Sequence, residues 1–179
     1  MITFPNAYVS YLVEFHASRD YFECHELLEE YWKEHPGDGL ADTWVGFIQL
    51  AVGLYHERRG NKRGALKMLE QTERRLTDSP LESLGIEKKS LLEQLSQRLA
   101  ALRDDSHTDY ADIDLNIIND ELWSRCLAEC AERGWEWGKP SPIEDASIIQ
   151  RHKLRDRTDV IAARLAAYEA KKRERDGMV

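Results

Sequence analysis

The chain has 179 residues, of which 42% are hydrophobic and 32% charged, a composition typical of globular rather than disordered proteins. No apolar run approaches the roughly 20 residues that a membrane-spanning helix needs, and the N-terminus lacks the layout of a secretory signal. The net charge of −8 argues against a general nucleic-acid binder, and three cysteines argue against a disulfide framework. We therefore expect a cytoplasmic protein with no membrane partner.

Nearly every segment has helical periodicity, and no alternating stretch predicts a strand. The predicted helices cover about residues 5–16, 20–34, 41–59, a segment starting after Asn61, a Leu-rich segment at 91–102, 119–133, and one or two helices over 143–175. Asp20 and Asn61 are expected N-caps, and the polar residues 103–116 are expected to be irregular.

The sequence contains one sign of an internal repeat. An offset of 41 residues aligns Asp20 with Asn61 and Leu28 with Leu69, which indicates two copies of a helix–turn–helix hairpin. A third copy is absent, whereas a stacked solenoid usually needs three. The predicted fold is therefore an all-α, compact multi-helix bundle built on two antiparallel hairpins, with a basic C-terminal helix.

The expected organisation has three parts. Residues 1–133 form the helical bundle, residues 134–142 form a loop rich in Trp, Gly and Pro, and residues 143–179 extend the same domain as a basic helix. Residues 151–179 hold nine Lys or Arg and five Asp or Glu, so this segment carries +4 and the remainder −12. Such a basic helix either docks on the acidic body or a partner, or remains solvated.

A polar cluster is predicted on two neighbouring helices. His25 and Glu29 lie at the border of the apolar face of the helix over 20–34, and Gln49 and His56 share a line on the helix over 41–59. In an antiparallel pair, His25 and His56 would lie at similar depth. The cluster is interpreted as a buried polar network or, alternatively, as a divalent-metal or acid–base site formed by His25, Glu29 and His56.

The turn at Gly60–Gly64 supports a third interpretation. Free N–H groups at the start of the next helix, with Asn61, Lys62 and Arg63, would hold a phosphate or carboxylate ligand. The competing explanation is that basic residues here only complement a helix dipole.

Two further patterns are assigned structural roles. Cys126 and Cys130 have helical spacing on an apolar face, which predicts core packing. Trp135 and Trp137 are expected to fix the loop that joins the body to the tail, and the alternative is that they anchor a partner peptide.

The sequence resembles the prokaryotic domain-of-unknown-function family 309. The resemblance is found in two stretches, Asp20–Trp32 and Gly46–His56, and in the Gly60-Asn61 and Gly64-Ala65 pairs that follow them. The resemblance covers about residues 10–78, and the Arg-Asp-Arg run at 155–157 is similar to longer members from spore-forming Gram-positive bacteria. It implies an all-helical fold and no defined reaction. Its motif positions in this chain are Asp20, Phe22, His25, Glu29, Trp32, Gln49, Gly60, Asn61, Gly64 and Ala65.

Together these patterns lead to a functional expectation. The primary prediction is a non-enzymatic interaction or scaffold protein that uses the groove beside the helices at 20–34, 41–59 and after Asn61, or the basic C-terminal helix. The alternatives are an enzyme centred on His25, Glu29 and His56, with a divalent metal as cofactor, and an anion-binding protein at the Gly60–Gly64 turn.

Overall fold

The computed structural model describes residues 3–104, 109–154, 165–173 and 177. The chain forms two units, Met1–Ile149 and Gln150–Val179. The described residues form helices and no strand, with one isolated bridge, so the all-α prediction is confirmed. Within this part of the chain, no helix has the length and apolar character needed to cross a membrane.

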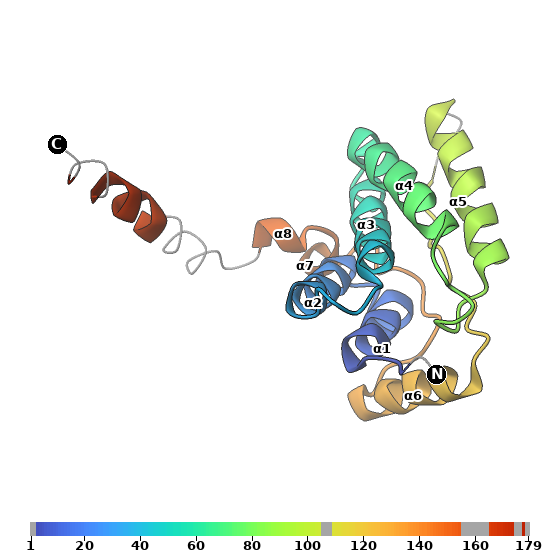
Figure 1. Ribbon diagram of the computed structural model, residues 1–179. Coiled ribbons are helices and arrows are strands. Elements are labelled where there is room, and N and C mark those ends of the chain that lie inside the picture. The colour runs from blue at the N-terminus through green and yellow to red at the C-terminus, as the bar shows by residue number, and fades with distance from the viewer. Residues whose placement is uncertain (1–2, 105–108, 155–164, 174–176, 178–179) are drawn as a thin grey trace. The chain divides into compact units, whose positions relative to one another are not determined.

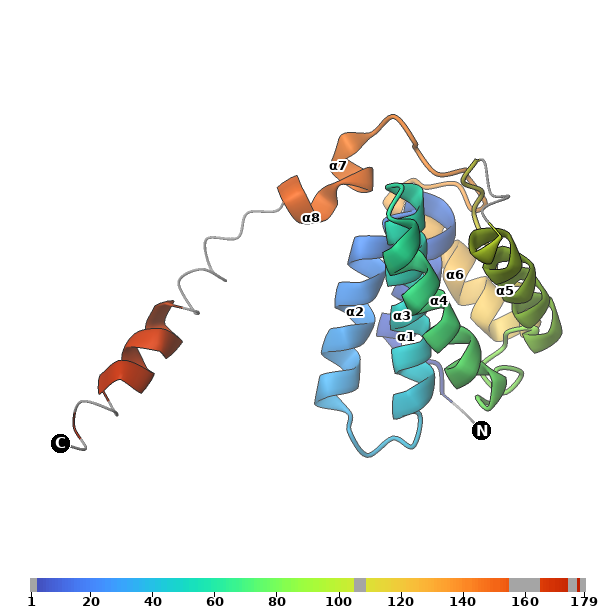
Figure 2. The same ribbon diagram turned by 90° about the horizontal axis from the view of Figure 1, so that it is seen from above.

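The first unit is a set of packed helices, connected by short turns as far as α4 and by longer irregular segments from α4 to α7 (Figure 1). Its helical elements are α1 (Asn6–Val13), the π-helix η1 (Glu14–Ser18), α2 (Tyr21–Glu34), α3 (Ala41–Arg58), α4 (Lys62–Thr77), α5 (Lys88–Arg103), α6 (Asp120–Arg133) and α7 (Ala146–Ile149). Helices α2, α3 and α4 lie side by side, as Figure 2 shows, and α6 packs against α1.

Both predicted N-caps are confirmed. The Asp20 side chain accepts a hydrogen bond from the Glu23 N–H at 3.0 Å, and the Asn61 side chain accepts one from the Gly64 N–H at 3.0 Å. Each cap follows a residue in the left-handed region, Arg19 with φ 57° and Gly60 with φ 83°. The turn that opens α2 therefore recurs 41 residues later at the start of α4.

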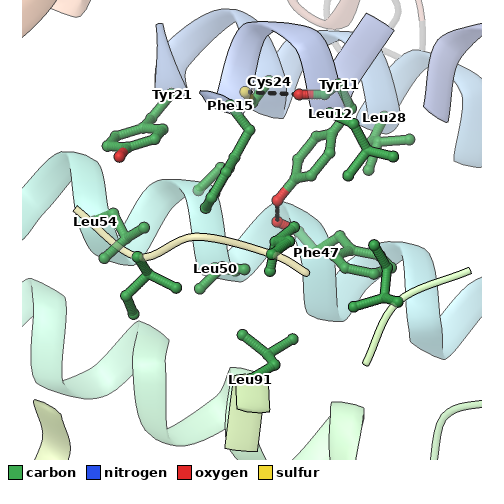
Figure 3. Packing of buried hydrophobic residues seen from close by; sticks show 14 of the residues in the cluster. Tyr11, Leu12, Phe15, Tyr21, Cys24, Leu28, Phe47, Leu50, Leu54 and Leu91 are labelled. Atoms are coloured by element: carbon green, nitrogen blue, oxygen red, sulfur yellow. Dashed lines mark hydrogen bonds between the residues drawn. The ribbon is translucent and has the colours of Figure 1, made fainter. Parts of the chain in front are cut away.

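Aromatic side chains from α1 and α3 pack together in a core that is otherwise rich in leucine, and Cys24 and Leu28 of α2 lie beside them (Figure 3). The Tyr11 hydroxyl donates to the Phe47 carbonyl at 2.8 Å, and the Cys24 thiol lies 3.5 Å from the Tyr11 carbonyl. Because these groups are satisfied internally, the rings can be buried completely. Full burial of each large side chain stabilises the fold by about 1.5–3 kcal/mol.

Two segments differ from their predictions. The predicted helix over 5–16 changes at Val13 into the π-helix η1, a widening that helical periodicity does not distinguish from a regular helix. Residues 109–116 form no regular element, as predicted, but the segment is less polar in its packing than expected: Ile113 and Leu115 are buried, and Ile117 forms a bridge with Ile86. Residues 105–108 lie outside the described residues.

The predicted helix over 143–175 begins later than expected. The Asp145 side chain accepts a hydrogen bond from the Ser147 N–H at 3.0 Å, and α7 starts at the residue between them. The second unit contains α8 (Arg151–Leu154) and a helical segment over 165–173 in which Leu165 and Tyr168 are exposed. The predicted helix over 155–164 and 174–175 lies outside the described residues.

Candidate functional site

His25 and Glu29 belong to a row of interacting polar side chains along the surface of α2. The His25 Nε2 atom lies 2.6 Å from Glu29 Oε2, and the other Glu29 oxygen accepts a hydrogen bond from Lys33. The bond from Lys33 lowers the pKa of Glu29 against the effect of partial burial, and His25 adds to the lowering. About a quarter of the His25 side chain is exposed, and its ring packs edge-on against Phe22.

His56 belongs to a different cluster, at the end of α3. The Asn61 amide donates to His56 Nδ1 at 3.2 Å, and the Asn61 N–H donates to the His56 carbonyl at 2.8 Å. Burial and the neighbouring charge of Arg59 lower the pKa of His56. A Cβ atom at Gly64 would lie 3.0 Å from His56 Cγ, so glycine permits this close packing.

The predicted polar residues are thus distributed over three contacts. Gln49 donates to Gln71 at 2.6 Å and accepts from Arg75 at 3.1 Å, which places it in the interface between α3 and α4. Within the described ranges, no three His, Cys, Asp or Glu side chains gather as a metal-binding group, so His25, Glu29 and His56 do not form the predicted ligand set. Of the other motif positions, Ala65 is buried and Trp32 packs partly buried against the core.

Arg19 is the centre of a buried ionic network that was not predicted. Its guanidinium donates to the carbonyls of Lys139 and Ile113 at 2.8 and 3.3 Å and to the Asp114 carboxylate at 2.8 Å. Asp112 lies 3.8 Å from it. These bonds connect two segments distant in sequence, 112–114 and the loop after α6, to the turn before α2.

Asp112 is the main acceptor of this network. The Tyr21 hydroxyl donates to one of its oxygens at 2.9 Å, and the Ser141 N–H donates to the other at 2.8 Å. Burial opposes ionisation of this carboxyl group, but the hydrogen bonds from Ser141 and the charge of Arg19 outweigh burial and lower its pKa. The Tyr110 hydroxyl donates to Tyr21 at 3.0 Å and extends the chain of bonds.

A cavity of about 410 Å³ lies beside this network, at the turn between α3 and α4. Its lining residues are Glu57, Arg58, Gly60, Lys62, Asp109, Tyr110 and Ile143. Of the residues predicted to bind an anion, Lys62 lines the cavity, Asn61 caps α4, and Arg63 is exposed and is not part of the lining.

A second cavity, of about 440 Å³, lies along the start of α6, and we call it the α6 groove. It is lined by residues 114–120 together with His16, Trp123, Trp137 and Gly138. The Trp137 ring stacks on His16 at 4.2 Å and meets Trp123 edge-on at 5.0 Å between centroids. The Gly138 N–H donates to the His16 carbonyl at 2.9 Å, so Trp137 fixes its loop to the body, whereas Trp135 is 37% exposed and its ring lies under the Arg133 guanidinium.

The cysteines are buried and unpaired, as the spacing of Cys126 and Cys130 predicted. Burial raises the pKa of Cys126 to about 12 and also raises that of Cys130. Thiols with raised pKa values are poor nucleophiles and poor metal ligands at neutral pH, which agrees with a packing role.

Comparison with known proteins defines the family. A family model described as "Domain of unknown function (DUF309)" matches residues 8–68, from α1 into α4. A similar protein from Bacillus subtilis (strain 168), "Uncharacterized protein YpuF", is 45% identical over 175 residues, covering 97% of this chain and 99% of the relative. The chain therefore belongs to the DUF309 family, and the resemblance found in the sequence is confirmed. No solved structure matches it.

Proposed function

We propose that this protein is a non-enzymatic interaction protein that binds a basic segment of a partner protein in the α6 groove. The observation that carries the proposal is the pair of perpendicular tryptophans, Trp123 and Trp137, at the wall of a cavity of about 440 Å³. Tryptophan side chains at a surface cavity are typical anchors of protein interfaces.

Exposed apolar side chains extend this surface. Ile118, Trp123 and Leu127 are 54%, 36% and 42% exposed, and the last two lie one turn apart on α6. Burial of such large apolar side chains is favourable, so a partner that covers them would gain binding free energy.

The acidic side chains of the α6 groove favour a basic partner. Asp114 and Asp120 line it, and the side chain of Asp114 is 62% exposed even though it pairs with Arg19. The first 150 residues carry a net charge of −12. Complementary charge speeds association and fixes orientation, so the expected ligand is a Lys- or Arg-rich segment with an apolar anchor.

The alternative enzyme centred on His25, Glu29 and His56 has less support. The first two residues contact each other and Lys33, whereas His56 is bonded to Asn61. Binding through the groove beside α2, α3 and α4, or through the basic C-terminal helix, stays a prediction.

Site-specific photocrosslinking in the native cell tests the proposal. A photoreactive residue replaces Ile118, which lines the α6 groove and is 54% exposed. The matched control replaces Lys67, an exposed residue on α4 that does not line the groove. We expect one partner to be captured at Ile118 and not at Lys67, with the crosslinked peptide basic in composition, and the substitution Trp123→Ala to abolish capture.

Two results would contradict the proposal. One is equal capture at both positions, which would indicate random collisions. The other is capture that survives Trp123→Ala in a protein whose circular dichroism is unchanged, which would exclude the tryptophan pair as the anchor.

A further inference from the structure

Arg58, the last residue of α3, has unused hydrogen-bonding capacity inside the protein. Its side chain is 8% exposed, and its Nη1 group donates to the Arg19 carbonyl at 2.7 Å and to the Ser141 hydroxyl at 3.1 Å. The Nε and Nη2 groups are buried and have no hydrogen-bond partner. The guanidinium lies 4.4 Å from the centroid of the Tyr21 ring, which offers its face and no acceptor atom.

The unpaired donors of Arg58 destabilise the folded protein unless a ligand accepts hydrogen bonds from them. A buried donor without an acceptor destabilises the fold, and a buried charge does so more strongly. In the part of the chain that the structure describes, no carboxylate forms an ion pair with Arg58, in contrast to Arg19 and Arg98, which pair with Asp114 and Glu57.

Other features of the same cavity favour an anion. Arg58 and Lys62 both line it, and Lys62 is the first residue of α4, whose N-terminus carries a partial positive charge. The Asn61 side chain accepts from the N–H of Gly64, so the cap accounts for one N–H group at this N-terminus. Two carboxylates, Glu57 and Asp109, also line the cavity, and the Oε2 atom of Glu57 accepts from Arg98 at 2.7 Å.

We propose that the cavity between the α3–α4 turn and the 109–110 segment binds a small phosphomonoester through Arg58 and the start of α4. A guanidinium matches two oxygens of one phosphate, and a doubly charged phosphate uses Arg58, Lys62 and the helix dipole together. The volume of about 410 Å³ exceeds that of a bare phosphate, and Tyr110 and Ile143 supply an apolar wall for an organic group.

Calorimetric titration of the full chain with phenyl phosphate, and separately with inorganic phosphate, tests the proposal. We expect saturable binding of phenyl phosphate, with the inorganic ion binding more weakly because it leaves the apolar wall uncovered. Arg58→Lys keeps the charge and loses the paired donors, so the affinity should fall at least about tenfold.

The matched pair Lys62→Gln and Arg63→Gln separates a defined site from diffuse attraction. Both variants remove one positive charge from the first turn of α4, but only Lys62 lines the cavity. We expect Lys62→Gln to weaken binding at least severalfold and Arg63→Gln to leave it nearly unchanged. Should Arg58→Lys fail to fold, this pair decides the outcome.

Three results would overturn the proposal. They are the absence of binding by the folded wild-type chain, equal losses in the Lys62 and Arg63 variants, and unchanged affinity in a folded Arg58→Lys variant. None of them bears on the α6 groove, because neither Arg58 nor Lys62 lines it.

Discussion

His16 is expected to make the stability of the protein fall in mild acid. Its ring is 2% exposed, with Nδ1 2.7 Å from the Leu12 carbonyl and Nε2 accepting from the Leu115 N–H at 2.9 Å. The neutral tautomer with a proton on Nδ1 satisfies both contacts. A second proton on Nε2 would face the Leu115 N–H, so protonation would break a buried hydrogen bond.

The size of the effect follows from the shift in pKa. Burial lowers the pKa of His16 from 6.5 to about 4 in the folded protein. Between these values the unfolded chain binds the proton and the folded chain does not, so the free energy of unfolding decreases as the pH falls. A shift of this size corresponds to about 3 kcal/mol, full above pH 6.5 and lost progressively toward pH 4.

Other groups titrate in the same pH range, so their contribution is removed by comparing the wild type with a variant that lacks His16. Burial raises the pKa of Glu14, which gives a contribution of the opposite sign. Urea unfolding of the wild type and of His16→Gln, at about pH 7 and about pH 4.5, isolates the histidine. The wild type should lose about 2–3 kcal/mol more than the variant between these two pH values.

A direct titration tests the same reasoning. The carbon-13 shift of the His16 ring, followed by NMR, should show no protonation above about pH 5. A midpoint near 6.5, or equal acid sensitivity of the wild type and His16→Gln, would refute the assignment of a buried neutral ring.

Three further outcomes are expected. Arg19→Ala should lower the free energy of unfolding by about 3 kcal/mol, because it leaves the Asp112 carboxylate without its cationic neighbour. Arg19→Gly should lower it by about 1 kcal/mol less, since glycine adopts φ 57° without strain. Equal urea midpoints for the two variants would exclude backbone strain at this position. Asn61→Ala should cost about 1 kcal/mol in thermal unfolding through loss of the α4 cap, and an unchanged melting temperature would contradict this. The cysteines should react with a thiol reagent only after unfolding, and labelling of the native protein would show that they are accessible.

Local signals predicted the helices and their caps. Asp20 and Asn61 each precede an apolar helical pattern, and a side-chain oxygen at that position satisfies a free N–H whatever the tertiary context. Such features depend on a few neighbouring residues, which is why α2, α3 and α6 begin and end within one residue of their predicted limits.

The candidate site was harder to predict because it depends on contacts distant in sequence. Rise per residue predicts that His25 and His56 lie at one level of the bundle, but it does not fix the direction of a side chain. His56 instead contacts Asn61, because the chain reverses at Gly60 and brings the cap back to it.

One signal of the buried network was present and was missed. The offset of 41 residues aligns Arg19 with Gly60, and both hold left-handed conformations. Arginine pays a penalty there that glycine avoids, so its presence in a repeated turn indicates a compensating role for the side chain. Its partner Asp112 lies 93 residues away in a polar stretch, where no periodic pattern marks it.

Arg19 also explains why the two proposed sites need separate variants. Its guanidinium contacts Asp114, which lines the α6 groove, and its carbonyl accepts the hydrogen bond of Arg58, which lines the other cavity. A substitution at Arg19 therefore disturbs both sites, and loss of either activity in such a variant would not identify its cause. Trp123 and Lys62 each line only one of the two cavities, so variants at these positions assign a loss of partner or of phosphate binding to its own site.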